Sequence, residues 1–142
     1  MQALQQVVYT GIATATGGRE GTAKSNDEAL NLALSTPAAL GGAGGSGTNP
    51  EQMFAAGYSA CFIGAIKHVA AAGGVKLADD IAVTGEVDIG PIEAGFGIAV
   101  RLTVDLKDLA QETAQALVEK AHQVCPYSNA TRGNIAVDIK LA

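Results

Sequence analysis

The sequence is short of cysteine, of aromatic residues and of positive charge. Its 142 residues include two cysteines, no tryptophan and 4% aromatic residues. Nine Lys and Arg residues stand against fourteen Asp and Glu residues, which gives a net charge of −5 at pH 7. The few basic residues form no stripe that could follow a phosphate backbone, so we expect no nucleic-acid partner.

The N-terminus lacks the basic start and apolar stretch of a signal peptide, so we expect a reducing, cytoplasmic location. Cys61 and Cys125 lie far apart and outside any C-x-x-C pattern. In that compartment a bridge between them would be transient and catalytic rather than a permanent cross-link. The alternative is that both are small buried side chains, because free cysteine is among the most buried residue types.

A membrane-length apolar run is also missing. Residues 53–66 carry no charge, but Glu51 and Lys67 bound this run, and about 18 to 20 uncharged residues are needed to span a bilayer. We therefore predict a core helix over residues 49–72, with Asn49 as its N-cap, and no membrane insertion. Because no face of the uncharged run is polar enough for water, we expect the helix to be buried nearly all round, partly by a second copy of the chain.

The rest of the chain shows the patterns of several strands and one further helix. Apolar alternation and turn residues predict the strands, and the helical period predicts an amphipathic helix that Asp108 caps. The expected strands cover residues 7–16, 19–25, 30–34, 81–89, 98–106 and 134–141, the second helix covers residues 109–124, and a turn covers residues 91–97. This order predicts an α+β fold, with antiparallel sheets around a long buried central helix, in one domain spanning residues 1–142.

Cys61 lies near the middle of the predicted core helix, where the helix stabilises an ionised thiol very little. The helix dipole acts only within the first turn, and burial among apolar side chains raises a thiol pKa. Cys61 therefore needs a cation if it is to act as a nucleophile. Arg19, next to Gly17 and Gly18, is the most suggestive candidate, and Glu51 at the helix entrance could hold its guanidinium in place.

Three motifs resemble one known family. TGGREG around Arg19, NPEQMFAAGYSACF around Cys61 and VCPYSNATRGNI around Cys125 are similar to the organic hydroperoxide resistance (Ohr) branch of the OsmC/Ohr superfamily. The similarity covers essentially the whole chain in order. It implies an OsmC-like intertwined homodimer in which Cys61 is the peroxidatic thiol, Cys125 resolves it, and Arg19 and Glu51 complete the site.

The resemblance implies a thiol-dependent peroxidase that reduces alkyl and fatty-acid hydroperoxides to alcohols. Cys61 would become a sulfenic acid and then form a disulfide with Cys125, which an external dithiol, expected to be a lipoylated protein, would reduce. No metal or other cofactor is required. We expect Met53, Phe96 and Tyr127 to contact the substrate. The alternatives are a non-enzymatic dimeric carrier of apolar ligands and a thiol-disulfide exchanger without peroxidase activity.

The spacing of Glu51 and Cys61 raises a geometric question. Ten residues of straight helix separate them by about 15 Å and place them on different faces. We therefore hypothesise that the helix bends near Gly57, or that the Glu51 and Cys61 of one site come from different subunits.

Four other polar residues have no assigned role at this stage. His68 and His122 could complete a Cys2His2 zinc set, but Cys61 and His68 lie two helical turns apart, so we do not expect a metal site. Arg132 and Asn134 belong to the motif around Cys125, where a role in fixing a turn and a catalytic role both remain open.

Overall fold

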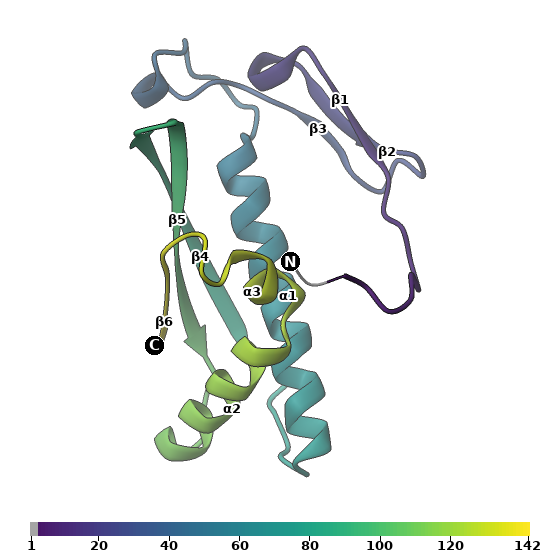
Figure 1. The fold of residues 1–142 in the computed structure, drawn as a ribbon, viewed down its shortest axis with the longest axis vertical. Helices are drawn as coiled ribbons and strands as arrows, with labels where there is room; N and C mark the ends of the chain where they lie inside the picture. Colours follow the sequence, from purple (N-terminus) through teal and green to yellow (C-terminus); the bar gives the residue numbers. More distant parts are fainter. Residues whose placement is uncertain (1–2) are drawn as a thin grey trace. The chain divides into compact units, whose positions relative to one another are not determined.

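The structure is a computed structural model and describes residues 3–142 (Figure 1). The chain divides after Pro50 into two compact units, which are described separately. The prediction of a single domain stays a prediction.

The first unit holds a three-stranded antiparallel sheet with the strand order β1-β2-β3. Its elements are β1 (Ala13–Thr16), the 3-10 helix η1 (Gly18–Glu20), β2 (Thr22–Ser25), β3 (Asn31–Ala33) and the 3-10 helix η2 (Ala38–Leu40). The three predicted antiparallel strands are therefore confirmed, although each is shorter than predicted.

Two boundaries in this unit were predicted wrongly. Residues 7–12 are not part of β1, because β1 pairs with the four residues of β2 and the chain before Ala13 extends past the end of that partner strand. Arg19 does not begin the returning strand but lies inside η1, after Gly17 and Gly18, which both have positive φ. The turn is therefore longer than a two-residue hairpin turn.

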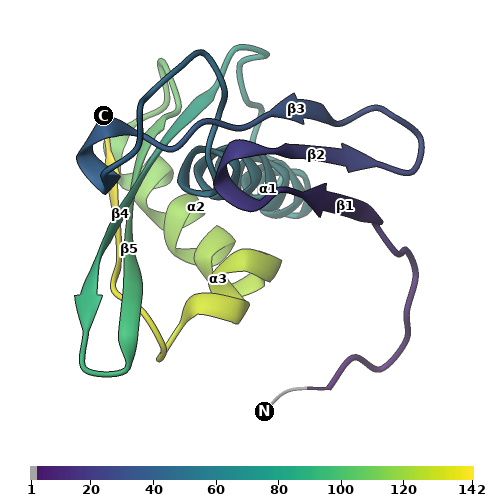
Figure 2. The same ribbon diagram turned by 90° about the horizontal axis from the view of Figure 1, so that it is seen from above.

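The second unit packs two helices on one face of a three-stranded sheet (Figure 2). Its elements are α1 (Pro50–Ala72), β4 (Ala82–Ile92), β5 (Gly95–Asp105), α2 (Gln111–Val124), α3 (Pro126–Thr131) and β6 (Val137–Leu141), with the strand order β4-β5-β6. The α+β class with a long central helix is confirmed.

The prediction that both sheets are wholly antiparallel is wrong. Strands β4 and β5 are antiparallel, but β6 runs parallel to β5. The connection from β5 to β6 contains α2, and a helix that crosses over a sheet returns the chain in the same direction as the strand it left.

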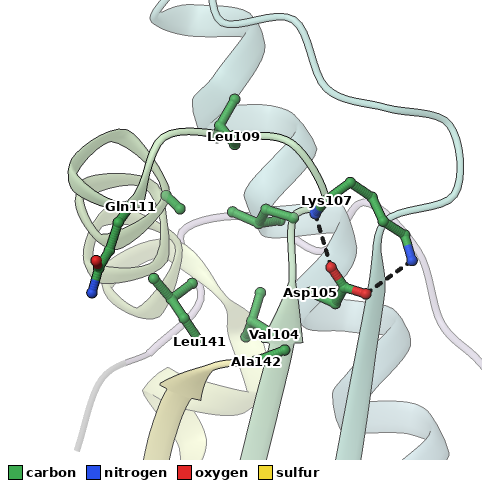
Figure 3. A pocket seen from close by; sticks show the side chains of 9 residues that line it. Val104, Asp105, Lys107, Leu109, Gln111, Leu141 and Ala142 are labelled. Carbon is green, nitrogen blue, oxygen red and sulfur yellow. Dashed lines mark hydrogen bonds and ion pairs between the residues drawn. The ribbon is translucent and has the colours of Figure 1, made fainter.

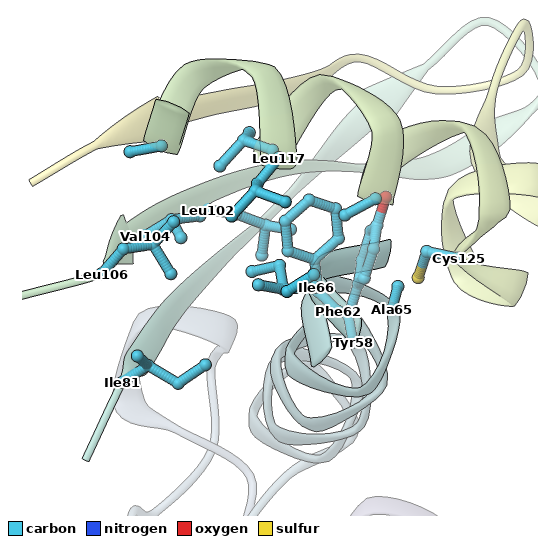
Figure 4. Close-up of a cluster of buried hydrophobic side chains, with 14 of the residues drawn as sticks. Tyr58, Phe62, Ala65, Ile66, Ile81, Leu102, Val104, Leu106, Leu117 and Cys125 are labelled. Carbon is cyan, nitrogen blue, oxygen red and sulfur yellow. The ribbon is translucent and has the colours of Figure 1, made fainter. Parts of the chain in front are cut away.

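The alternation in the strands places one face of the sheet against the helices. Val100, Leu102 and Val104 of β5 are buried, and they contribute to a single apolar cluster with α1 and α2 (Figure 4). Opposite Leu102, β4 has Gly85, whose missing Cβ would lie 2.7 Å from Ser59 Oγ and 3.0 Å from the carbonyl oxygen of Ala55. Glycine at this position therefore allows close contact between the strand and α1.

Helix α1 covers the predicted residues, but in this chain it is not buried all round. Its buried residues form one stripe, namely Tyr58, Ser59, Phe62, Ala65, Ile66 and Ala70. By length and composition alone, α1 could also cross a membrane, but a core helix passes the same test, and this stripe belongs to the core of the second unit. The expectation that a second copy covers the remaining faces stays a prediction.

Three details of the C-terminal half differ from the predictions. Helix α2 begins at Gln111 after Ala110, not after Asp108, and Leu109 packs against the core from the preceding loop. The sequence predicts no element between residues 124 and 134 and so misses the short helix α3, although proline, here Pro126, is favoured at a first helical position. The turn between β4 and β5 is only two residues long, so Phe96 lies in β5 and not in a turn.

Candidate functional site

The two cysteines, which lie far apart in sequence, meet between α1 and the α2–α3 corner. Their Sγ atoms are 3.7 Å apart, and neither is part of a disulfide. Cys125 is fully buried at the edge of the apolar cluster (Figure 4), whereas Cys61 is partly exposed. A reagent from solution therefore reaches Cys61 first.

Cys125 owes its position to a sharp change of direction in the chain. It is the C-cap of α2 and the N-cap of α3, with an extended backbone (φ −65°, ψ 125°). Pro126 favours this extended conformation, because its ring disfavours helical geometry in the preceding residue. The corner thus places Cys125 between α2 and α3, with its Sγ atom 3.7 Å from that of Cys61.

The surroundings of Cys61 do not by themselves favour its thiolate. Burial raises the pKa of the Cys61 thiol, a hydrogen bond with the Tyr127 backbone lowers it, and the neighbouring Cys125 raises it further. The net direction is upward. The hydrogen bond with the Tyr127 backbone thus favours ionisation of Cys61, but it does not outweigh burial.

An aromatic cluster lies next to the thiols. The Tyr127 ring centroid is 5.5 Å from that of Tyr58 and 5.8 Å from that of Phe54. A Cβ at Gly57 would come within 2.9 Å of the Tyr127 hydroxyl, so glycine gives this ring its place against α1. Tyr58 and Phe62 are core residues, while Tyr127 remains 37% exposed and borders the thiol pair.

A chain of buried hydroxyl groups lies behind the cysteines. Ser128 Oγ is 2.8 Å from the Tyr58 hydroxyl and 2.9 Å from His122 Nδ1. Thr131 donates its hydroxyl to the Tyr127 carbonyl at 2.8 Å. Burial, and then the charge of Arg132, lower the pKa of His122. The sequence prediction missed Ser128, and the only signal was a small polar residue inside the motif around Cys125.

The roles of Arg132 and Asn134 can now be compared. Arg132 donates hydrogen bonds to the carbonyl oxygen of His122 in α2 and to the Asn129 side chain in α3. The Asn134 backbone N–H donates to Thr131 at 3.0 Å, just after α3. The side-chain contacts of Arg132 favour its turn-fixing role, whereas the backbone bond of Asn134 leaves the role of that side chain open.

Three of the predicted site residues lie together in the second unit. Cys61, Cys125 and Tyr127 are neighbours within the second unit. Arg19 belongs to the first unit, and Glu51 and Met53 lie in the first turn of α1, so their predicted places at the thiol stay predictions. Phe96 lies near the β4–β5 turn and is 77% exposed.

The question about the bend in α1 also stays open. Helix α1 continues without interruption through Gly57, and the close contact with Tyr127 gives that glycine a packing reason. Neither observation decides whether Glu51 and Cys61 of one site come from one subunit or from two.

Two other features of the described residues do not compete with the thiol pair. A pocket at the end of β5 and the start of α2 includes neither cysteine in its lining (Figure 3). Among residues 3–142, no group of three or more His, Cys, Asp and Glu side chains could hold a metal ion. The thiol pair is therefore the candidate site.

Comparison with known proteins now decides the family. Residues 42–140 match the OsmC-like protein family. The organic hydroperoxide resistance protein of Xanthomonas axonopodis pv. citri is 58% identical over 142 residues, which is 100% of each chain. The chain belongs to the OsmC-like family, in its Ohr branch.

Solved structures of Ohr-branch proteins agree with this fold. The organic hydroperoxide resistance protein from Legionella pneumophila is 48% identical and superposes with a TM-score of 0.90, covering 96% of this chain and 99% of that chain. OhrB of Bacillus subtilis is 46% identical with a TM-score of 0.87, covering 96% of this chain and 100% of that chain. The Ohr fold therefore extends over nearly the whole sequence.

Proposed function

We propose that this protein acts in organic hydroperoxide resistance as a thiol-dependent peroxidase. The observation that carries the proposal is the 3.7 Å separation of a partly exposed and a fully buried thiol. A disulfide requires about 2.0 Å between the sulfur atoms, so a small side-chain movement suffices to join them. The names of the Ohr relatives support the same role.

The first two steps use only the two cysteines and the peroxide. The Cys61 thiolate attacks one oxygen of the hydroperoxide, the O–O bond breaks, and the alkoxide leaves as the alcohol after taking up a proton. Cys61 is thereby oxidised to a sulfenic acid. The Cys125 sulfur then attacks the Cys61 sulfur, the S–O bond breaks, and the hydroxide leaves as water with the Cys125 proton.

An external dithiol completes the cycle. One of its thiolates attacks the Cys61–Cys125 disulfide, and its second thiol closes on the mixed disulfide, which returns both cysteines to the reduced form. We propose a dihydrolipoyl group on a lipoylated protein as this reductant. No metal ion or bound cofactor takes part in this cycle.

In this proposal, Arg19, oriented by Glu51, favours the ionised form of Cys61. Burial raises the pKa of Cys61, so a guanidinium beside the sulfur is needed to keep the thiolate populated near neutral pH. Arg19 also stabilises the charge that develops on the peroxide oxygens, and Glu51 orients Arg19. Tyr127, Met53 and Phe96 provide apolar contacts for the alkyl part of the substrate.

The active form is proposed to be a cytoplasmic homodimer. The faces of α1 outside its buried stripe are apolar and have no charge between Met53 and Ile66, so a second copy would remove apolar surface from water. Sedimentation should give twice the mass of one chain, and a monomer at micromolar concentration that is fully active would contradict this part of the proposal.

A thiol count tests the proposed function. Reduced protein is mixed with cumene hydroperoxide or tert-butyl hydroperoxide, and free thiols and the alcohol product are measured over time. Loss of both thiols with one alcohol formed per protein chain supports the peroxidase. Unchanged thiols would favour the apolar-ligand carrier, and thiols that react with disulfides but form no alcohol would favour the disulfide exchanger.

A further inference from the structure

The hydroxyl group of Ser128 connects three helices behind the thiol pair. Ser128 belongs to α3, Tyr58 to α1 and His122 to α2, and the Ser128 Oγ lies 2.8 Å and 2.9 Å from its two partners. Tyr58 and Ser128 are both fully buried, so water does not replace these bonds. A buried hydroxyl that loses its partner carries a full desolvation cost.

These bonds converge on the corner that holds Cys125. The Cys125 backbone makes the last hydrogen bond of α2 and the first of α3, to Ala121 and from Asn129, both at 2.9 Å. Its sulfur is therefore placed by the angle between the two helices. Ser128 and His122 lie on opposite sides of this corner, and Tyr58 ties Ser128 to the helix that carries Cys61.

Two directions of the hydrogen bonds satisfy every hydroxyl proton in this chain. Thr131 donates its single hydroxyl proton to the Tyr127 carbonyl in both. In one, Tyr58 donates to Ser128, and Ser128 donates to Nδ1 of His122. In the other, His122 donates from Nδ1 to Ser128, Ser128 donates to Tyr58, and Tyr58 donates to Thr131 at 3.4 Å. Both directions keep Ser128 bonded to Tyr58 and to His122.

We propose that Tyr58, Ser128 and His122 are positioning residues that hold Cys125 against Cys61 and so set the rate of disulfide closure, not the rate of peroxide attack. The proposal rests on the proposed function for its place in the catalytic cycle. None of the three contacts the reacting oxygen atoms in the mechanism above. They act through the corner, and a misplacement of about 1 Å between reacting groups can slow a step about a hundredfold.

Single-turnover measurements separate the two steps. Reduced Ser128→Ala and Tyr58→Phe proteins are mixed with tert-butyl hydroperoxide, quenched at set times, and analysed by intact mass for sulfenic acid and disulfide. We expect Cys61 oxidation at the wild-type rate, accumulation of the sulfenic acid, and disulfide closure slowed about tenfold or more. Closure at the wild-type rate in both variants would overturn the proposal, as would an equal slowing of both steps.

Matched variants distinguish positioning from general loss of structure. Ser59 is a buried serine of α1 that lies next to Tyr58 in sequence but outside the hydrogen-bonded chain of Tyr58, Ser128 and His122. In Ser59→Ala, the disulfide should therefore close at the wild-type rate. His122→Asn keeps a hydrogen-bonding group near the position of Nδ1 and should recover closure, whereas His122→Leu should not. Equal closure rates in the Asn and Leu variants would contradict a role for the hydrogen bond between residue 122 and Ser128.

A second assay needs no peroxide and so does not depend on the proposed function. An aromatic disulfide that releases a coloured thiolate reacts with Cys61 to give a mixed disulfide, and Cys125 then displaces the second coloured thiolate as the protein disulfide closes. The second release should be about tenfold slower in Ser128→Ala than in Ser59→Ala. If the wild type does not react with peroxide but the two variants differ in the rate of the second release, the peroxidase proposal fails and the positioning proposal stands. Equal rates of the second release in the two variants would contradict the positioning proposal alone.

Discussion

The two thiols are neighbours with opposite surroundings. Cys61 lies within a continuous helix, partly exposed, and its raised pKa comes first from burial. Cys125 lies at a break between two helices, fully buried, and is placed by the corner and its hydrogen bonds. The difference separates two requirements of a two-cysteine cycle: access and ionisation for the first thiol, and accurate placement for the second.

The largest expected effect comes from removing the exposed thiol. Cys61→Ser should lower hydroperoxide reduction about a thousandfold or more, because a serine hydroxyl stays protonated and Cys125 is buried. Alcohol formation from cumene hydroperoxide measures this. If Cys125 alone consumed peroxide at a comparable rate, the contrast in access between the two thiols would be wrong.

Removing the buried thiol should spare the first turnover. In Cys125→Ser, Cys61 should react with one peroxide at nearly the wild-type rate and then stop as a sulfenic acid, because no second thiol lies within reach of it. Trapping with a sulfenic-acid reagent and intact mass would detect this state. A stable disulfide product, or a first turnover as slow as in Cys61→Ser, would contradict the assigned order of the two thiols.

Arg19→Ala tests how Cys61 is ionised. The thiolate is the reactive form, so the rate of alkylation rises as the pH rises through the Cys61 pKa. Without the guanidinium, the upward shift caused by burial is no longer offset, and this rise should move to higher pH. At neutral pH, peroxide reduction should fall about a hundredfold. Arg19→Lys, which keeps the charge, should recover part of the activity, and an unchanged pH profile in Arg19→Ala would refute this account.

Gly57→Ala should have the smallest effect. The added Cβ would approach the Tyr127 hydroxyl to 2.9 Å, so the ring must move and shift the backbone that favours the Cys61 thiolate. The gain in helix propensity, about 1 kcal/mol, should offset the strain, so thermal unfolding should change little while peroxide reactivity falls a few fold. Adding Tyr127→Phe removes the contacting hydroxyl and should restore reactivity. If reactivity does not recover, the contact with the Tyr127 hydroxyl is not the cause of the loss.

The local sequence pattern predicted the long elements of the second unit well. The uncharged run predicted α1 with correct ends, and the alternation predicted β4 and β5 within a few residues. It missed the short helix α3, and it failed where the deciding contact was distant. Strand β6 runs parallel to β5 because α2 crosses over the sheet, and β1 is short because its partner strand ends at Ser25.

The sequence by itself determined most of the strands, the two long helices, the apolar character of α1 and the motifs around Cys61 and Cys125, because periodicity and residue type are local properties. Only the tertiary structure decided that the two sulfur atoms lie 3.7 Å apart and that Ser128 links Tyr58 to His122. The physical reason is that a contact between residues distant in the chain depends on how helices pack. That packing includes steric details such as the space at Gly57 and Gly85, which no periodicity records.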